Sequence, residues 1–402
     1  MVLMKVLIQG WTKIPHSYAI VNVFQIVHLR KNFPELELYT LEYPYYNQLW
    51  NEKVKFFDSL YPKEYYTYLV GVKEWKGESI DLIYSITYPY DIDMLSLSTD
   101  PGKIIPKCVF YTSEFSVLSP EYFKMSTKVI DDETIKNHIT THSERLFFTC
   151  PSEWSQRGMK GYGIEDSRNR IISHGVDTSL FKKLKSNKSI RKYYNVKDDE
   201  ILIGVIGAMT RNKGIVQILQ SFKEIVVDKG LKKYKLMLKG MQDLYATRQF
   251  LQVYLDEINA PESLMDNIVF IDSTLSFINM NGIYNCIDVY LSPYIAEGFN
   301  LAPLEAMAAG TPVILPRGGS TKEYSEMLSE FGCITFVESE SVSNCNVYNV
   351  PDITKAILEY KKGFDYNTVH NCISEKLSWD VAAKQLYQYF CEIRAPTSKT
   401  EF

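Results

Sequence analysis

Apolar residues along the chain fall into short continuous runs, and these runs alternate with longer segments in which apolar positions recur at helical spacing. Continuous apolar runs of roughly four to eight residues are typical of strands buried on both faces of a parallel sheet. The runs form two series, separated by a polar, lysine-rich segment. The predicted strands are 2–9, 36–40, 80–85, 108–111, 146–150 and 170–173 in the first series, and 200–206, 235–239, 267–271, 289–292, 312–315 and 333–336 in the second.

Segments with helical spacing separate the predicted strands. They are 18–31, 152–160, 214–228, 245–257, 276–285 and 301–309, and a last predicted helix covers 378–393. This alternation of strand and helix predicts two doubly wound α/β sheets with right-handed crossovers. The chain has 402 residues, which fits two domains of about 180–200 residues each. We place them at 1–180 and 199–377, with the lysine-rich segment 181–198 as the linker.

Composition narrows the class of protein. Hydrophobic residues make up 46% of the chain and charged residues 23%, which is enough to bury two cores. The formal net charge is −4, so the basic excess typical of nucleic-acid-binding proteins is absent and we expect no nucleic-acid partner. The seven cysteines are scattered and form no Cys-x-x-Cys pair, which argues against a disulfide or zinc framework and for a reducing, cytoplasmic location.

The sequence gives no sign of a membrane-spanning segment. No apolar run approaches the roughly 20 residues that span a bilayer, so we expect a soluble protein. The apolar N-terminus ends in a glycine turn at Gly10, and we interpret it as a first strand rather than a signal peptide. The basic run in 181–198 fits a solvated linker, while peripheral contact with an anionic lipid surface stays open.

Two acidic residues bracket the most informative segment of the second series. Glu297 follows the predicted strand 289–292, and seven residues separate it from Glu305. Pro303 suits the first turn of a helix and Gly310 the residue just past its end. Glu305 then lies about one turn inside a helix whose N-terminus favours a phosphate, at the edge where open α/β sheets bind ligands. Each glutamate alone also fits a structural role, as a charge in a first helical turn or an ordinary loop carboxylate.

The segment from Glu297 to Glu305, followed by the small residues 306–310, resembles the Glu-x7-Glu signature of the family 4 retaining glycosyltransferases. The similarity is good from residue 150 onward and weak before it. The other matching stretches are 151–155, 171–177 with Phe181, 203–207, 213–214, 313–316, 318–319 and Glu323. The resemblance implies the α/β GT-B fold, in which two doubly wound Rossmann-like domains face a central cleft. It also assigns the C-terminal segment 378–402 to the first domain.

The resemblance implies transfer of a hexose, with retention, from a nucleotide diphosphate sugar to a hydroxyl acceptor on a glycan, a protein-linked glycan or a lipid-linked sugar. It implies no metal ion or other cofactor. GDP-mannose and UDP-glucose are both usual donors in the family, and family frequency favours GDP-mannose. Asp91 and Asp93 have the Asp-x-Asp spacing that the other large glycosyltransferase fold uses for a divalent ion. We interpret them as a chance occurrence, because that fold lacks the lysine and the paired glutamates.

The resemblance also assigns donor-binding residues. Lys213 contacts the diphosphate, Glu297 binds a sugar hydroxyl near the reacting carbon, and Glu305 accepts hydrogen bonds from the ribose. The other expected donor contacts are the backbone of Gly298, Phe299, Asn300 and Leu301 and the strand-ending glycines Gly10 and Gly207.

One feature of the family is missing. Members usually carry a Gly-Arg pair whose arginine precedes the lysine by five residues, whereas this chain has Gly207 followed by Ala208. Arg211 either supplies that second positive charge, as a catalytic residue beside Lys213 and Glu297, or is an exposed loop arginine.

The nucleotide base and the acceptor have weaker signals. Topology places the base against the loops after strands 235–239 and 267–271, unless those loops are plain turns. The candidate base contacts are Gly240, Met241, Ser273, Thr274 and Leu275. The first domain should supply the acceptor pocket, but the histidine that many members have after strand 108–111 is replaced. Either Ser113 or Glu114 contacts the sugar there, or His16 approaches from a neighbouring loop.

Other functions fit the same pattern. A GT-B nucleotide-sugar epimerase or a phosphorylase-like enzyme would share the sheets and the donor residues. A sugar-nucleotide-binding protein without catalytic activity would explain the missing arginine and the missing first-domain histidine.

Overall fold

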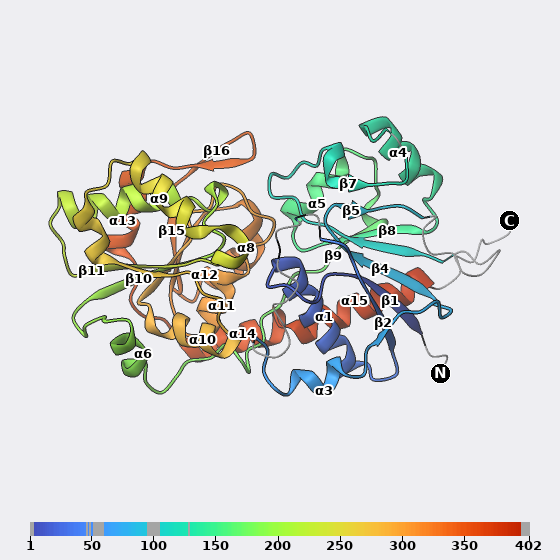
Figure 1. The fold of residues 1–402 in the computed structure, drawn as a ribbon, viewed down its shortest axis with the longest axis horizontal. Coiled ribbons are helices and arrows are strands. Elements are labelled where there is room, and N and C mark those ends of the chain that lie inside the picture. The colour runs from blue at the N-terminus through green and yellow to red at the C-terminus, as the bar shows by residue number, and fades with distance from the viewer. Residues whose placement is uncertain are drawn as a thin grey trace. The chain divides into compact units, whose positions relative to one another are not determined.

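The computed structural model describes residues 4–45, 47, 50, 60–94, 105–127 and 129–394. Contacts divide the chain into two compact units (Figure 1). The first unit contains the residues up to Gly175 and those from Trp379 onward, apart from the short segment Ser59–Tyr61. The second unit contains that segment and Val176–Ser378.

A parallel sheet forms the centre of the first unit. Among the described residues its seven strands run in the order β3-β2-β1-β4-β6-β8-β9. Their bounds are β1 Lys5–Gly10, β2 Glu37–Glu42, β3 Lys73–Glu74, β4 Leu82–Ile86, β6 Lys107–Phe110, β8 Leu146–Cys150 and β9 Asn169–Ile171. The six strands predicted for this series are therefore confirmed, although the start of 2–9 lies outside the described residues. The short edge strand β3 was not predicted.

Helices cover both faces of this sheet. Figure 1 shows α1 and α15 on one side and α4, with the short pair β5 and β7, on the other. The bounds are α1 Ser17–Asn32, α3 Tyr65–Leu69, α4 Asp132–Thr141, α5 Glu153–Lys160, α15 Trp379–Arg394, the 3-10 turn η1 Pro120–Tyr122, β5 Tyr90–Asp91 and β7 Phe123–Lys124. The apolar side chains of β6, β8, α4 and α5 form one core with those of β5 and β7.

The second unit has its own parallel sheet. Six of its described strands run in the order β12-β11-β10-β13-β14-β15, and β16 and β17 form a separate antiparallel hairpin. The bounds are β10 Ile201–Ile206, β11 Tyr234–Lys239, β12 Ile268–Ile271, β13 Val289–Leu291, β14 Val313–Pro316, β15 Ile334–Val337, β16 Glu340–Val342 and β17 Cys345–Val347. The predicted strands of the second series are confirmed, and the hairpin was missed.

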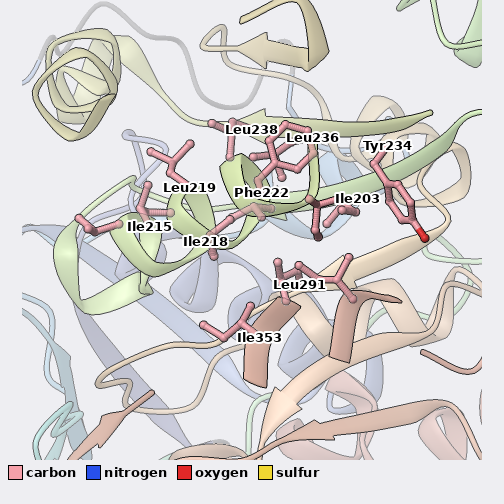
Figure 2. Packing of buried hydrophobic residues seen from close by; sticks show 14 of the residues in the cluster. Ile203, Ile215, Ile218, Leu219, Phe222, Tyr234, Leu236, Leu238, Leu291 and Ile353 are labelled. Atoms are coloured by element: carbon pink, nitrogen blue, oxygen red, sulfur yellow. The ribbon is translucent and has the colours of Figure 1, made fainter. Parts of the chain in front are cut away.

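Helices again flank the sheet of the second unit on both sides (Figure 1). Their bounds are α6 Lys188–Tyr193, α7 Ile215–Lys223, α8 Gln242–Tyr245, α9 Thr247–Glu257, α10 Phe277–Cys286, α11 Ala302–Ala308, α12 Lys322–Ser329, α13 Val350–Glu359 and α14 Tyr366–Lys376. Figure 2 shows Ile215, Ile218, Leu219 and Phe222 of α7 packed against Leu236 and Leu238 of β11. The spacing of these four residues is what predicted the helix.

The segment 181–198, predicted as a linker, is folded within the second unit. It contains α6, and the Arg191 side chain of α6 is only 7% exposed. The Arg191 guanidinium donates to the Cys286 carbonyl at 2.9 Å and to the Asp288 carboxylate at 3.0 Å. These bonds attach α6 beside the start of β13.

A cluster of polar contacts holds the start of α15 against α1 in the first unit. The Asp380 carboxylate lies 2.7 Å from His28 Nδ1 and from Asn32 Nδ2, and 2.9 Å from Lys31 Nζ. Burial tends to raise the pKa of Asp380, but these donors outweigh burial and hold the pKa well below its usual range. Next to it, the Trp379 ring stacks on Phe24 with centroids 5.3 Å apart.

We expect Asp380→Asn to destabilise the first unit by about 1 kcal/mol at pH 7, since solvent partly screens these contacts. A carboxyl group whose pKa is depressed by folding adds stability above its unfolded pKa, and this contribution is lost as the pH falls through the folded pKa. The difference between variant and wild type should therefore shrink below about pH 4.

All five tryptophans lie in the first unit, so tryptophan fluorescence during urea unfolding reports on that unit. Glu392→Gln is the matched control, because Glu392 pairs with Arg170 from a side chain that is 54% exposed. Equal stability of Asp380→Asn and wild type at pH 7 would contradict the role given to this cluster.

Candidate functional site

The second sheet reverses its strand order at β10. Strand β10 lies between β11 and β13, so the connections that leave these strands run in opposite directions. Open α/β sheets bind ligands outside the carboxyl ends of strands at such a point. The segments that follow β10 and β13 here are the turn Arg211–Lys213 and the loop 292–301.

Asn212 joins this turn to the loop. Its backbone carbonyl accepts from the N–H groups of Ile295 at 2.7 Å and Ala296 at 3.2 Å. Its side-chain amide donates to the Ala296 carbonyl at 3.2 Å. Three hydrogen bonds therefore fix the residues on either side of Asn212 next to the loop that carries Glu297.

Gly214 is required by the same close approach. Its φ is +72°, a left-handed conformation that side chains other than glycine rarely adopt. A Cβ atom at this position would lie 2.1 Å from the Pro293 carbonyl oxygen, in the loop after β13. The glycine that precedes α7 thus allows the backbone after β10 to touch the backbone after β13.

The result is an ion pair between Lys213 Nζ and Glu297 Oε1. The Glu297 side chain is 8% exposed and the Lys213 side chain 28% exposed. A carboxylate this buried needs a partner, because its desolvation is otherwise costly. Two predicted site residues, 84 positions apart, therefore meet, and Lys213 keeps solvent access through which an anion could reach it.

The loop after Glu297 is held by side chains. Asn300 has a φ of +65°, its amide donates to Ser292 Oγ at 2.9 Å, and its carbonyl accepts from Tyr324 Oη at 2.9 Å. Phe299 packs on the Tyr324 ring with centroids 5.5 Å apart. Gly298 and Leu301 lie in the same loop, and Leu301 is the residue that precedes α11. These contacts stabilise the observed conformation of the loop predicted to approach the sugar.

Glu305 lies in the first turn of α11, as predicted, and Pro303 is also in that turn. Its carboxylate is partly buried and accepts from Tyr284 Oη at 2.6 Å. Burial raises the pKa of Glu305 to about 7, and the Tyr284 hydrogen bond opposes part of that rise. The structure therefore gives Glu305 one protein partner, and its contact with a ribose stays a prediction.

Arg211 does not join the pair of Lys213 and Glu297. Its guanidinium donates to both carboxylate oxygens of Glu257 on α9, at 3.2 and 2.6 Å, and lies over the Tyr254 ring. Its side chain is 62% exposed. The structure thus pairs Lys213 with Glu297 but pairs Arg211 with α9, and a diphosphate contact by Arg211 stays a prediction. No sequence pattern indicated the pair with Glu257.

The two loops predicted to hold the base are bonded to each other. Gly240 N–H donates to the Ile271 carbonyl at 2.7 Å, and the residue after Met241 donates from its N–H to the Asp272 carbonyl at 2.8 Å. Ser273, Thr274 and Leu275 follow Asp272 and precede α10. A Cβ atom at Gly207 would lie 3.8 Å from Lys213 Cε, so Gly207 is beside the lysine stem.

Lys239, the last residue of β11, was not among the candidate site residues predicted from the sequence. It is 4% exposed and its ammonium donates to the Gly240 carbonyl. Burial lowers the pKa of Lys239 to about 8, and the nearby Asp272 carboxylate opposes the shift. The available signal was a lysine directly after the apolar residues Leu236, Met237 and Leu238.

The candidate residues of the first unit have distinct environments. His16 caps α1, with Nδ1 accepting from the Tyr18 N–H at 3.2 Å, and burial lowers the pKa of His16 to about 3. Ser113 is 1% exposed and donates to the Val117 carbonyl at 2.8 Å. Glu114 is exposed. A Cβ atom at Gly10 would lie 2.6 Å from the Ile86 carbonyl oxygen, so β1 and β4 end in close contact.

The Asp-x-Asp pair is part of a buried network. Asp91 accepts from Lys107 Nζ at 3.1 Å, and both side chains are at most 5% exposed. Asp93 accepts a hydrogen bond from Ser126. In the part of the chain that the structure describes, no three His, Cys, Asp or Glu side chains gather as metal ligands would. Among the described helices, none is both long and apolar enough to cross a bilayer.

Part of the chain is similar in sequence to known glycosyltransferases. Residues 200–338, which contain Lys213, Glu297 and Glu305, match the sequence profile of the family described as glycosyl transferases group 1. An uncharacterized glycosyltransferase of Methanocaldococcus jannaschii is 24% identical over 265 residues, 62% of this chain and 60% of that protein. The capsular polysaccharide biosynthesis glycosyltransferase CapM of Staphylococcus aureus is 30% identical over 142 residues, 35% of this chain and 34% of that protein. The chain thus spans less than two thirds of the length of these curated relatives.

The fold matches over nearly the whole chain. The crystal structure of Anabaena HepE in complex with UDP and glucose superposes with a TM-score of 0.65 and 14% sequence identity, covering 96% of this chain and 99% of that one. The predicted fold class is confirmed: the chain has the GT-B fold, with two Rossmann-like domains.

We expect Gly214→Ala to destabilise the second unit by about 3 kcal/mol, because the left-handed φ and the clash with the Pro293 carbonyl add up. Gly230→Ala is the matched control. Its φ is +67°, and no atom of the described residues lies within 4 Å of the added Cβ, so it should cost only about 1 kcal/mol. Thermal unfolding followed by circular dichroism measures both, and equal losses would show that the contact with Pro293 does not matter.

Proposed function

We propose that the chain is a retaining glycosyltransferase that transfers a hexose from a nucleotide diphosphate sugar to a hydroxyl acceptor. The observation that carries this proposal is the Lys213–Glu297 pair at the point where the second sheet reverses its strand order. It lies inside the segment that matches the glycosyl transferases group 1 profile. A cation and a carboxylate held side by side suit a ligand that has an anionic part and a hydroxyl-bearing part.

Sugar transfer depends on stabilising the leaving group. When the bond from the anomeric carbon to the phosphate oxygen breaks, its electron pair stays on the diphosphate, and positive charge develops on the sugar ring. A preorganised cation near the phosphate lowers the energy of this state. We assign that role to Lys213, whose ammonium then moves from Glu297 towards the phosphate. Glu297 in turn accepts a hydrogen bond from a sugar hydroxyl.

Retention follows if the acceptor attacks from the face that the diphosphate leaves. The acceptor oxygen bonds to the anomeric carbon, and its proton passes to the departing phosphate oxygen. Glycosidases instead use two opposed carboxylates. The carboxylate of Glu297 is paired with Lys213, and that of Glu305 with Tyr284, which suits binding better than attack. The mechanism uses no metal ion, so transfer should survive a chelator.

The donor and acceptor are proposed as classes. GDP-mannose remains the first donor to test and UDP-glucose the second, since HepE was crystallised with UDP and glucose. The acceptor is a hydroxyl on a glycan, a protein-linked glycan or a lipid-linked sugar. We propose a cytoplasmic location, the compartment of these activated sugars.

One observation favours a second candidate. Arg211 pairs with Glu257 rather than with the turn beside Lys213, so the positive charge expected there is engaged on α9. A binding protein without catalysis would need only Lys213. Donor binding without turnover, with acceptors supplied, would support that function.

We expect Lys213→Ala to lower kcat/KM for the donor about 100-fold, because it removes the cation that stabilises the leaving group. Release of nucleoside diphosphate from GDP-mannose and UDP-glucose is the measurement, and NMR of the product gives its anomeric configuration. Lys229→Ala is the control, since Lys229 pairs with Glu224 at 2.9 Å just beyond α7. An unchanged kcat/KM in Lys213→Ala, or an inverted product, would contradict the mechanism.

Donor affinity should depend on pH through Glu305. Two ribose hydroxyls can both donate to its carboxylate only when it is ionised, and burial raises the pKa of Glu305 to about 7. We therefore expect the Kd of the intact sugar nucleotide to rise as the pH falls from about 8 to about 6. The Glu305→Gln variant should bind more weakly and without this pH dependence. Calorimetric titrations test this, and the same pH dependence in both proteins would exclude Glu305 as its source.

A further inference from the structure

The first sheet reverses its strand order as the second does. Strand β1 lies between β2 and β4, so the carboxyl ends of β1 and β4 border the point of reversal. Three tyrosines that are neither buried nor fully exposed come from segments that follow strands of this sheet. Tyr18 is in the first turn of α1, Tyr88 is the second residue after β4, and Tyr122 ends η1 in the connection after β6.

The three rings form a continuous strip with Tyr88 in the middle. The Tyr88 ring centroid lies 6.3 Å from that of Tyr18 and 6.1 Å from that of Tyr122. The inner sides of these rings pack on the core of the first unit, which includes the fully buried Tyr90. The outer sides keep part of their surface in solvent.

Hydrogen bonds hold one end of the strip. Tyr18 Oη lies 2.9 Å from Tyr90 Oη and 3.0 Å from Thr112 Oγ1. Tyr90 Oη in turn donates to the Thr112 carbonyl at 2.5 Å. The strip is therefore a fixed surface, with a hydroxyl group at the Tyr18 end.

A carboxylate borders the strip. Glu114 is exposed and follows β6. It is the second residue after Thr112, whose hydroxyl lies 3.0 Å from Tyr18 Oη, and its backbone carbonyl accepts from Trp154 Nε1 at 2.8 Å. Burial chiefly, and then the charge of Glu114, raises the pKa of Tyr122. Packing at the edge of a core explains half-buried tyrosines, but it does not explain why an exposed carboxylate lies beside them.

Aromatic faces next to a carboxylate suit one kind of ligand. The C–H groups on one face of a pyranose ring carry partial positive charge and pack well on the electron-rich face of an aromatic ring. The hydroxyls at the edge of that pyranose can donate to a carboxylate. A phosphate would instead be repelled by Glu114. The neighbouring His16 adds no positive charge, because burial lowers the pKa of His16 to about 3.

We propose that Tyr18, Tyr88 and Tyr122, with Glu114, form a subsite that binds an uncharged sugar ring of the acceptor. The pyranose lies on Tyr88, and Glu114 accepts from its hydroxyls. Calling the bound sugar an acceptor rests on the proposed function. The binding of a sugar ring itself can be tested without any donor. It makes these residues determinants of acceptor specificity.

Saturation-transfer NMR on the full chain tests this binding directly. The probes are the methyl pyranosides of glucose, galactose, mannose and N-acetylglucosamine, without nucleotide. We expect saturation of the ring protons of at least one glycoside by the wild-type protein. Tyr88→Ala should weaken the binding of that glycoside about tenfold. Tyr88→Phe should bind it nearly as well as wild type does, because the aromatic face remains. Glu114→Gln should also weaken the binding of the glycoside, by about fivefold.

Tyr193→Ala is the matched control, since Tyr193 on α6 of the second unit is 78% exposed. Circular dichroism checks that each variant folds, and Tyr122→Ala replaces Tyr88→Ala if the latter does not. Absence of saturation for every glycoside would overturn the subsite, as would equal binding by wild type and Tyr88→Ala. Equal loss in Tyr88→Ala and Tyr88→Phe would overturn the stacking. A different result would contradict the proposed function: sugar nucleotides would not bind to the second unit, while glycosides would still bind.

Discussion

The candidate site depends on the close approach of two chain segments, the turn after β10 and the loop after β13. The backbone of Asn212 and the absence of a side chain at Gly214 permit that approach. It brings Lys213 to a glutamate that is 84 residues away in the sequence, and the pair compensates the burial of Glu297. Without it the second unit would have a lysine in one loop and a costly buried carboxylate in another, and no combined site.

The two units use the same topology for different chemistry. Each has a doubly wound sheet whose strand order reverses at its first strand, and each places its candidate residues at the carboxyl ends on either side of that strand. In the second unit these residues are charged, and they suit a diphosphate and its sugar. In the first unit they are tyrosines beside Glu114, and they suit an uncharged ring. Under the proposed function, the loops and not the sheets determine which unit binds the donor and which binds the acceptor.

Much of the fold follows from local patterns, and those patterns were sufficient here. The apolar runs predicted the strands of both large sheets except the short edge strand β3, and the placement of Pro303 predicted the start of α11. Glu297 and Glu305 were selected because they lie in one compact motif, and Lys213 because a separate stretch, 213–214, resembles the same family. The hairpin of β16 and β17 was missed because its short strands, one exposed and one partly exposed, carry little apolar signal.

Tertiary partners could not be predicted in this way. Arg211 pairs with Glu257, 46 residues away, and His28 contacts Asp380 across 352 residues, and neither pair leaves a trace in sequence spacing. Tyr88 and Tyr122 are 34 residues apart, and only the fold brings their rings together. For the same reason the environment of Glu305, including Tyr284, became visible only in three dimensions.

The central claim is that Lys213 and Glu297 jointly bind an activated sugar. The most direct measurement is a crystal structure of the chain with an intact sugar nucleotide. We expect a diphosphate at the carboxyl ends of β10 and β13, with Lys213 Nζ within hydrogen-bonding distance of a phosphate oxygen and Glu297 accepting from a sugar hydroxyl. A nucleotide bound elsewhere, with the Lys213–Glu297 pair intact, would contradict it.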